Sequence, residues 1–253
     1  MKRVTDKTHW HDRTMFRFTR HFLFLLVILG SGSGAYAQAV GTVTHLSGVL
    51  TVNHADGSAA VLAVKSSILQ GDTLFTEANT YARVKFVDNG EMVVRPSSQV
   101  VVKSYVYDVD HPEKDKVAIR LVSGGLRSVT GLIGKRNHDA VSFETPTGTI
   151  GVRGTNFGAL FCQNDCGSVP TASGNTPSNG LHVDVAQGAI VLTNPVGQQV
   201  FQSGQFGYVA NLNSPPVVIP PMQGVQVTMP LSISQNAPAS AAAKGNTVDC
   251  VVR

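Results

Sequence analysis

The amino-acid sequence predicts an all-β fold: an antiparallel sandwich or roll, or a short solenoid built from repeated two-strand units. After residue 37, short runs of β-branched residues recur between turn residues, which is the pattern of an all-β domain. Glycine is frequent, with 25 residues, and charged residues make up only 14% of the chain. No segment after residue 37 has the apolar periodicity of a convincing helix.

The first 37 residues have the order of a secretory signal peptide. Two arginines precede an apolar run at residues 22–29, small residues follow, and Ala35-Tyr36-Ala37 stands before Gln38. The last feature is an A-x-A cleavage site, so we expect cleavage between Ala37 and Gln38 and a periplasmic or secreted protein. The run is shorter than the roughly 18–20 residues that cross a bilayer core; an uncleaved membrane anchor is the alternative. Met15, like Met1, is a candidate start.

Removal of this segment would change the charge balance. The chain has 20 Lys and Arg against 16 Asp and Glu. Six of the basic and two of the acidic residues lie within residues 1–37, so fourteen of each remain and the formal net charge of the rest is zero. A basic surface is the usual mark of nucleic-acid binding, and we therefore expect no nucleic-acid partner. The remaining residues suffice for one large all-β domain or two small ones.

The first half of the exported part predicts short strands separated by turns. Residues 81–87 alternate between polar and apolar side chains, as a half-buried strand does. The segments 54–57 and 88–90 contain turn-forming Asp, Asn and Gly, and Pro96 ends a strand. Residues 108–116 form a charged loop. The expected strands are residues 41–46, 49–53, 60–64, 73–76, 81–87, 91–95, 100–107 and 117–121.

A similar phrase occurs at residues 43–57 and 183–197, and a partial copy lies at residues 119–126. Each copy has a strand, a glycine that we expect to form a turn (Gly48, Gly188 and Gly124), and a second strand. Because the first two copies nearly keep the spacing of both glycines, we favour internal similarity over chance. Such two-strand units would stack or pair around a shared core.

From residue 212 onward the composition changes. Six prolines interrupt the segment, and residues 232–246 are rich in Ala, Ser and Asn. A segment of this kind buries little apolar surface. We therefore expect residues 213–253 to form an extended, partly disordered tail, in which residues 217–219 and 225–229 are candidate edge strands.

The sequence has no recognisable catalytic constellation. A G-x-S-x-G elbow, a P-loop, H-E-x-x-H and a Rossmann fingerprint are all missing. The acidic residues of segment 108–115 could bind calcium weakly, but lysines interleave with them and the glycine of a tight calcium loop is lacking. We expect a protein that is not an enzyme and has no cofactor, no metal site and no small-molecule substrate.

Three cysteines lie in the exported part. Cys162 and Cys166 enclose a short loop, and an oxidising compartment favours a disulfide between them. Zinc would need about four ligands, and no histidine lies near this pair. Cys250 is left over; it could be free, pair with one of the other two, or link to another chain.

The most distinctive stretch is VSFETPTGTIGVRGTNF at residues 141–157. It resembles the signature of the FecR-type domain, the periplasmic signalling domain of iron-transport regulators, with its core T-P-x(3)-I-G-V-R-G-T-x-F. Further phrases in the order of that family occur at residues 41–49, 69–76, 82–90 and 122–127. The resemblance covers about residues 40–210, and we expect a FecR-type domain at residues 38–212. Its signature residues here are Gly71, Asp72, Asp88, Gly90, Thr145, Pro146, Gly151, Arg153, Gly154 and Thr155.

We interpret these signature residues mainly as architectural. Gly71-Asp72 and Asn89-Gly90 are turn formers. Arg153 stands between two glycines, where we expect it to lie near the core and to need a carboxylate partner that offsets its desolvation. The alternative makes Arg153 a surface contact for a partner. The candidate carboxylates are Asp72, Asp88 and Glu144.

The resemblance implies a regulator with a cytoplasmic anti-sigma segment, a membrane span and then this domain. Because only a short segment precedes the apolar run, we expect the domain without the transmembrane signalling. Our main expectation is an exported, non-catalytic domain that binds another envelope component, preferably a protein, as sensor or scaffold. Recognition through a sheet surface or an edge strand needs no reactive side chain.

Two other functions stay open. One is a cell-wall or polysaccharide-binding module, which would use exposed aromatic rings; the available ones are Tyr81, Tyr105, Tyr107 and Tyr208. The other is a membrane-anchored signalling regulator of the iron-uptake type, which would retain residues 1–37.

Overall fold

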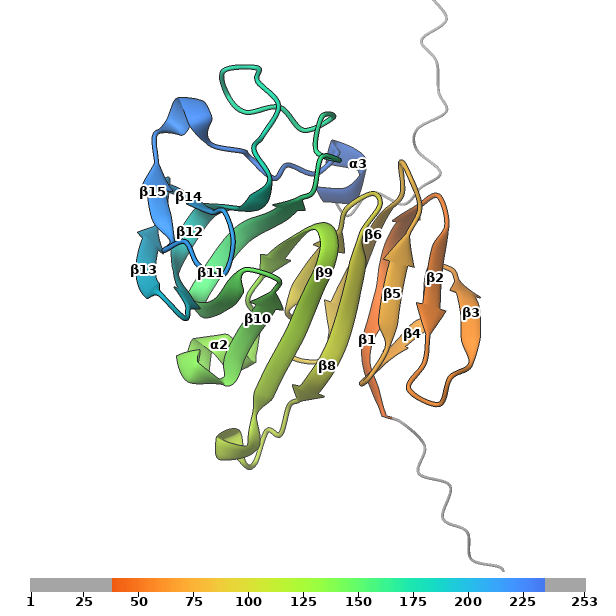
Figure 1. Cartoon of the computed structure of the whole chain (residues 1–253). Helices are drawn as coiled ribbons and strands as arrows, with labels where there is room; N and C mark the ends of the chain where they lie inside the picture. Colours follow the sequence, from red (N-terminus) through yellow and green to blue (C-terminus); the bar gives the residue numbers. More distant parts are fainter. Residues whose placement is uncertain (1–37, 235–253) are drawn as a thin grey trace, which may run out of the picture. The chain divides into compact units, whose positions relative to one another are not determined.

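The structure is a computed structural model that describes residues 38–234. The expected signal peptide, both candidate starts and Cys250 lie outside the described residues. Within residues 38–234, fifteen strands join into one hydrogen-bonded sheet (Figure 1). The expectation of an all-β fold is therefore confirmed.

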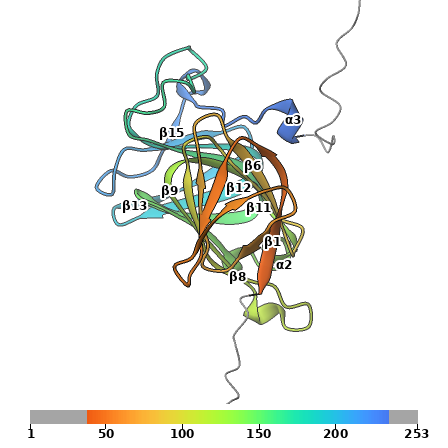
Figure 2. The same ribbon diagram turned by 90° about the vertical axis from the view of Figure 1, so that its right-hand side faces the viewer.

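The strand pairings divide this sheet into two rows. Row A runs in the order β15 (Val217–Ile219), β14 (Phe206–Val209), β12 (Gly180–Asn194), β11 (Gly148–Cys162), β9 (Lys116–Val129), β7 (Glu91–Val94), β6 (Tyr81–Phe86), β1 (Ala39–Ser47) and β4 (Ser67–Leu69). Row B runs in the order β13 (Gly197–Gln202), β12, β11, β10 (Val141–Thr145), β9, β8 (Gln99–Val106), β5 (Thr73–Thr76), β2 (Leu50–Asn53) and β3 (Ala59–Leu62). Figure 2 views the rows from the end that carries β1.

The long strands β9, β11 and β12 belong to both rows because each of them bends. The bends lie at Gly124, Gly154 and Gly188, which have φ of +73°, +62° and +79°. The turns that we expected at Gly124 and Gly188 are therefore wrong, since both strands continue through the glycine. A single positive φ redirects a strand without ending it, and glycine adopts that angle at little cost. Gly48, in contrast, does separate β1 from β2.

The two complete copies of the repeated phrase follow the same path. In the first copy β1 lies in row A, the chain crosses at Gly48 to β2 in row B, β3 pairs with β2, and β4 returns to pair with β1. In the second, β12 crosses from row A to row B at Gly188, β13 pairs with its second half, and β14 returns to its first half. The partial copy in β9 runs the opposite way, from row B to row A.

The hydrophobic core lies between the two rows. Leu50 of β2, Leu121 of β9 and Leu181 of β12 are at most 1% exposed. Phe143 of β10 meets Phe157 of β11 edge to face, with ring centroids 5.0 Å apart. Burial of each such side chain contributes about 1.5–3 kcal/mol, so contacts across the core hold the rows together.

One pairing departs from the expected antiparallel arrangement. Strand β10 runs parallel to β9, with Val141 opposite Val117. Parallel neighbours need a crossover, and helices α2 (Leu132–Arg136) and η2 (His138–Ala140) supply it between β9 and β10. The other short helices are η1 (Pro112–Lys114), η3 (Pro221–Gln223) and α3 (Leu231–Ser234). Within residues 38–234, no helix is long and apolar enough to span a membrane.

The chain beyond residue 212 packs on the sheet at least as far as Ile233. Residues 217–219 form the edge strand β15, as expected, whereas residues 225–229 do not join the sheet. We name residues 224–233 the C-terminal strap. Its Val227 is fully buried and lies over Gly158 of β11, where a Cβ atom would approach the Val227 Cβ to 2.4 Å. The Asp184 carboxylate would lie closer still, so the glycine makes room for both Asp184 and the strap.

Three arginines on the outer face of row A hold the strap by its backbone. Arg127 Nη1 donates to the carbonyl of Val227 at 2.9 Å, and Arg95 donates to that of Thr228. Arg83 Nη1 donates to the carbonyl of Ile233 at 3.3 Å. The strap therefore crosses β9 and β6 in turn, and its carbonyls are further acceptors for these buried arginines, of which Arg127 also donates to Asp184 and Arg83 to Glu91.

Candidate interaction surfaces

The signature pair Gly71-Asp72 closes the turn between β4 and β5. Gly71 has φ of +91°, and Asp72 is 1% exposed. One Asp72 oxygen lies 2.7 Å from His54 Nδ1, and the other accepts the Leu69 amide at 2.8 Å. Asp72 therefore joins its own turn to the loop between β2 and β3.

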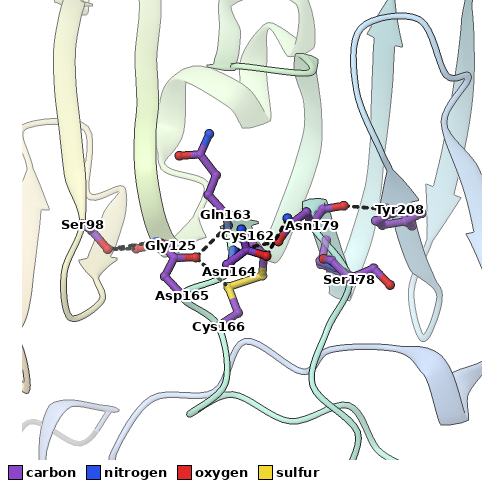
Figure 3. Close-up of a disulfide and its surroundings, with 11 residues drawn as sticks. Ser98, Gly125, Cys162, Gln163, Asn164, Asp165, Cys166, Ser178, Asn179 and Tyr208 are labelled. Atoms are coloured by element: carbon purple, nitrogen blue, oxygen red, sulfur yellow. Dashed lines mark hydrogen bonds between the residues drawn. A yellow bond between two sulfur atoms is a disulfide. The ribbon is translucent and has the colours of Figure 1, made fainter.

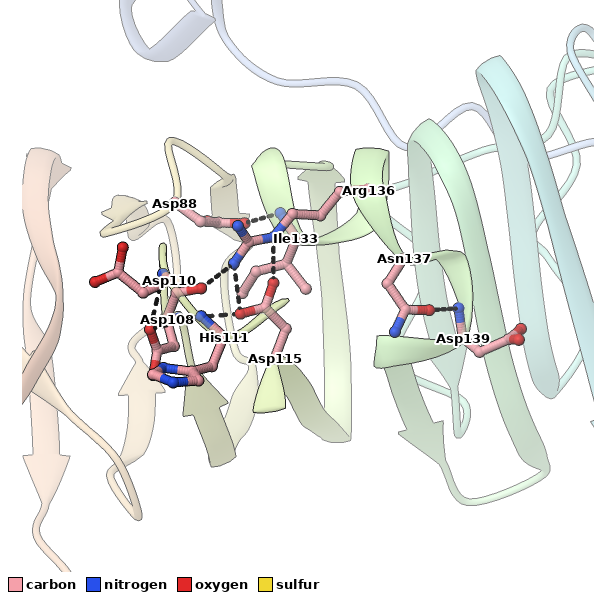
Figure 4. Close-up of polar contacts among 9 residues, drawn as sticks. All are labelled: Asp88, Asp108, Asp110, His111, Asp115, Ile133, Arg136, Asn137 and Asp139. Atoms are coloured by element: carbon pink, nitrogen blue, oxygen red, sulfur yellow. Dashed lines mark hydrogen bonds and ion pairs between the residues drawn. The ribbon is translucent and has the colours of Figure 1, made fainter. Parts of the chain in front are cut away.

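Asp88 performs a similar task in the turn between β6 and β7. Its buried carboxylate accepts the Tyr105 hydroxyl at 2.5 Å, the Gly90 amide at 2.9 Å and the Ile133 amide at 3.2 Å. The Ile133 contact fixes the first turn of α2 (Figure 4). Burial first, and the neighbouring carboxylate second, raise the pKa of Tyr105, so its hydroxyl stays protonated as a donor.

The threonines of the signature tie together the backbone at both ends of the first half of β11. Thr145 Oγ1 donates to the carbonyl of Gly148 at 2.7 Å, which closes the turn that contains Pro146. Thr155 Oγ1 donates to the carbonyl of Ala189 at 2.8 Å, beside the bend at Gly154. Both hydroxyls therefore hold backbone segments in place.

Arg153 does not lie near the core. Its side chain is exposed and makes no hydrogen bond or ion pair within residues 38–234. The expected carboxylate partner is therefore wrong, because alternation along β11 turns Ile150 and Val152 inward and Arg153 outward. That alternation is visible in the sequence and favours the alternative, a surface contact.

The three carboxylates considered for Arg153 have other partners. Asp72 and Asp88 make the contacts described above. Glu144 pairs with Lys103 at 2.7 Å and with Arg120 at 2.7 Å on the outer face of row B. Hydrogen bonds from Lys103 and then Arg120 lower the pKa of Glu144, which keeps it ionised.

The acidic loop 108–115 is held by the protein's own donors. Arg136 of α2 contacts both Asp115 oxygens, at 2.5 and 2.7 Å (Figure 4). The hydrogen bond from Arg136 lowers the pKa of Asp115, and Asp115 in turn raises the pKa of Arg136. Asp108 accepts the amides of Asp110 and His111. In the described part of the chain, no group of three or more His, Cys, Asp or Glu is placed to hold a metal ion.

Cys162 and Cys166 form a disulfide at the start of the long loop between β11 and β12 (Figure 3). Asn179, at the other end of this loop, accepts the Asn164 amide at 2.7 Å and donates to the Asn164 side chain at 2.9 Å. The base of the loop is therefore closed twice. The expected disulfide is present, and Cys250 lies outside the described residues.

Two hollows lie beside this closed loop base. The first, which we name the loop hollow, has a volume of about 350 Å³; it is lined by Thr171, Ser173, Asn175, Thr176, Ser178, His182, Tyr208, Ile219 and Gln223. The second, the end hollow, has a volume of about 570 Å³; it is lined by Pro146, Thr147, Phe161, Cys162, Gln163, Asn164, Asn179, Gly180 and residues 210–213. Neither hollow could be predicted from the sequence, because its lining residues come from separate segments of the chain.

The free ends of the rows are further candidate surfaces. Row B ends at β3 and β13, and row A ends at β4 and β15. Strand β3 pairs with β2 and with no other described strand, and its Val61 is 72% exposed. An uncovered edge offers unpaired backbone donors and acceptors to another chain.

Comparison with known proteins gives one family match. Residues 72–191 match the model of the family described as FecR protein. Two solved structures of a candidate anti-sigma factor from Parabacteroides distasonis ATCC 8503 are similar at 12% and 13% identity, each with a TM-score of 0.42. Each comparison covers 58% of this chain and 58% of the other, so the chain spans little more than half the length of that protein.

A third solved structure, described as a cell surface anchoring domain, is 31% identical over 24% of this chain and 82% of that one, with a TM-score of 0.24. No curated protein sequence matches the chain.

Proposed function

The chain contains a FecR-type domain, and we propose that this domain is an exported, non-catalytic binding module that acts in regulation as a sensor or scaffold. Its partner is another protein of the cell envelope. The partner adds an extended segment to the free edge of β3, so that backbone hydrogen bonds supply the affinity and side-chain contacts the specificity.

The observation that carries this proposal is the lack of protection on β3. Its four residues, Ala59–Leu62, contain no proline and no charged side chain, and Val61 points a largely exposed apolar side chain to solvent. Natural edge strands usually carry a lysine, a proline or a bulge that prevents pairing with other chains. An edge without these features is open to strand addition.

The opposite ends of the rows are better protected. Strand β15 has three residues and lies between Pro215-Pro216 and Pro220-Pro221. Strand β13 lies near β15, and a Cβ atom on its Gly197 would be 3.5 Å from Pro215. Proline cannot donate to a ladder, so these edges are less suited to accept a partner strand.

The test is photocrosslinking in intact cells. A tagged copy of the chain carries a photoreactive amino acid at position 61, and a matched copy carries it at Val109, which is 68% exposed in the loop between β8 and β9. We expect one discrete envelope protein to crosslink at position 61 and not at position 109. Capture of the same abundant proteins at both positions would contradict the proposal.

A substitution provides the second arm, in which the photoreactive amino acid is moved to the exposed Ala59 of the same strand so that position 61 can be varied. Val61→Lys places a charge on the edge and should abolish the discrete adduct formed from position 59, whereas Val109→Lys should leave it unchanged. Because both side chains are exposed, each change should alter the free energy of unfolding by no more than about 0.5 kcal/mol. An adduct that survives Val61→Lys would exclude β3 as the docking edge.

Export is part of the proposal and has its own measurement. Mass spectrometry of the protein recovered from the envelope should find a chain that begins at Gln38. A chain that retains residues 1–37 in the membrane would instead support the anchored regulator.

A further inference from the structure

The loop between β11 and β12 forms a preorganised surface at the end of the rows opposite to β3. The disulfide and the Asn164–Asn179 pair close its base. Its tip is tied to the start of the strap and to η3 just before it, because the Ala172 amide donates to the Gly224 carbonyl at 3.1 Å and the Ser173 amide to that of Met222 at 3.0 Å. A surface fixed at both ends loses little conformational entropy when a ligand binds.

Both hollows beside this loop are uncharged. Among the described residues that line the loop hollow and the end hollow, there is no Lys, Arg, Asp or Glu. Burial lowers the pKa of His182, so its imidazole is neutral at physiological pH. The hollows therefore do not select for a charged ligand, and their volumes fall in the range of small-molecule sites.

The lining offers many neutral hydrogen-bonding groups. In the loop hollow, Ser173 Oγ lies 3.0 Å from both Thr171 Oγ1 and Asn175 Nδ2, which forms a chain of hydroxyl and amide groups. In the end hollow, the side-chain amides of Gln163 and Asn213 have no hydrogen-bond partner within residues 38–234. These groups can donate and accept at once, as the hydroxyls of a sugar require.

An aromatic ring lies in the loop hollow. Tyr208 is half-buried, and its hydroxyl donates to the Asn179 carbonyl at 2.6 Å (Figure 3). The hydroxyl is thus engaged, and the ring is held in place beside the loop. Tyr208 also lies against His182, whose Nε2 donates to the Ser178 carbonyl at 2.8 Å and whose Nδ1 is a buried acceptor without a partner in residues 38–234.

From these observations we propose that the loop hollow and the end hollow together bind a neutral glycan. A sugar ring packs on Tyr208, and its hydroxyls bond to Ser173 and Asn175. The next unit reaches past Asn179 to the amides of the end hollow. Neutral donors and acceptors beside an aromatic ring suit a polyhydroxylated ligand, whereas a charged peptide or lipid headgroup would find no counter-charge here. This site is additional to the protein-binding edge at β3.

The test is calorimetric titration of the purified full chain with three soluble neutral tetrasaccharides: chitotetraose, cellotetraose and maltotetraose. We expect at least one to bind. Tyr208→Ala should weaken that binding at least about tenfold, because the ring supplies the main apolar contact. Ser173→Ala and Asn175→Ala should each weaken it about fivefold, the effect of one hydrogen bond.

Three controls keep the result specific. Tyr81→Ala removes a half-buried tyrosine of β6 and should leave glycan affinity unchanged. Tyr208→Phe keeps the ring and should retain affinity within about threefold, which separates loss of the ring from loss of the hydroxyl bond to Asn179. Val61→Lys should also bind glycan normally, so failure of the β3 proposal and failure of this one give different results.

Binding of none of the three tetrasaccharides would overturn the proposal. Binding that Tyr208→Ala and Tyr81→Ala weaken equally would overturn it as well. Circular dichroism melting of each variant identifies a protein that has merely lost its fold. In that case the Ser173 and Asn175 variants decide, because both side chains are exposed and their removal is not expected to unfold the protein.

Discussion

Removal of the Asp184 carboxylate should release the C-terminal strap and destabilise the whole domain. One Asp184 oxygen accepts Arg127 Nη1 at 3.0 Å, and the other accepts the Val227 amide at 3.0 Å. Asp184 and Arg127 are 4% and 8% exposed. In Asp184→Ala the arginine keeps its charge in a buried position without a counter-charge, and the strap loses one of its backbone anchors.

The structure sets the size of this effect. Breaking a buried ion pair by removing one partner costs about 3–5 kcal/mol. Arg127 keeps two neutral acceptors, Asn156 Oδ1 at 2.9 Å and the Val227 carbonyl at 2.9 Å, so we expect the lower part of that range, about 3 kcal/mol. For a urea dependence of about 2 kcal/mol/M, the unfolding midpoint should fall by about 1.5 M.

The assay is equilibrium urea unfolding, followed by limited proteolysis under native conditions. Asp184→Ala should show the lower midpoint and new cleavage within the strap. The control replaces both partners, Arg127→Met with Asp184→Leu, and should recover most of the stability because no buried charge is left unpaired. A loss below about 1 kcal/mol in Asp184→Ala, with a strap still resistant to protease, would refute this account of the ion pair.

Three further predictions concern other parts of the domain. The pKa of Asp115 is lowered by its hydrogen bond from Arg136, so its contribution to stability should be present above the usual carboxyl pKa and be lost as the pH falls through the lowered folded value. Asp115→Asn should therefore reduce the fall in the free energy of unfolding, measured in urea, between pH 5 and pH 2. The same fall in the variant as in the original protein would exclude this role. Replacement of Cys162 and Cys166 by Ala should lower the free energy of unfolding by about 2 kcal/mol, a modest amount because the disulfide closes a short loop. Calorimetric melting of the variant, and of the original protein with and without reductant, checks this. An unchanged melting temperature would contradict it. Gly158→Ala should cost about 1–3 kcal/mol by overpacking against Asp184 and against Val227 of the strap, whereas the exposed Gly167→Ala should be neutral in the same urea assay. Equal effects would show that the close approach at Gly158 is unimportant.

The short strands could be predicted where the signal is local. Strands were predicted from the turn residues at 54–57 and 88–90 and from the alternation of residues 81–87. The ends of these strands agree with the structure to within one or two residues. The long bent strands could not be predicted this way. A glycine with positive φ either ends a strand or bends it, and the outcome at Gly124 and Gly188 depends on partners in both rows.

The contacts of the candidate sites depend even more on distant residues. Asp88 contacts Tyr105 and Ile133, which are 17 and 45 residues away. The strap was expected to be part of a tail because prolines interrupt the segment and residues 232–246 are rich in Ala, Ser and Asn. Three buried side chains (Val225, Val227 and Ile233) and the arginine donors nevertheless hold it on the sheet. The exposure of Arg153, in contrast, could have been predicted from the sequence, because its alternation with Ile150 and Val152 places its side chain on the solvent face of the strand.

The two proposed binding surfaces lie at opposite ends of the strand rows, so both can be occupied at once. Strand β3 is the last strand of row B at one end, and β14, which carries Tyr208, lies next to the last strand of row A at the other (Figure 1). Mutations at sites that share no contacts act additively. Val61→Lys should therefore abolish the protein adduct without changing glycan affinity, Tyr208→Ala should do the reverse, and the double variant should show both losses and nothing more. A loss of the adduct in Tyr208→Ala alone would mean that the two surfaces are coupled through the core and are not independent ends of one scaffold.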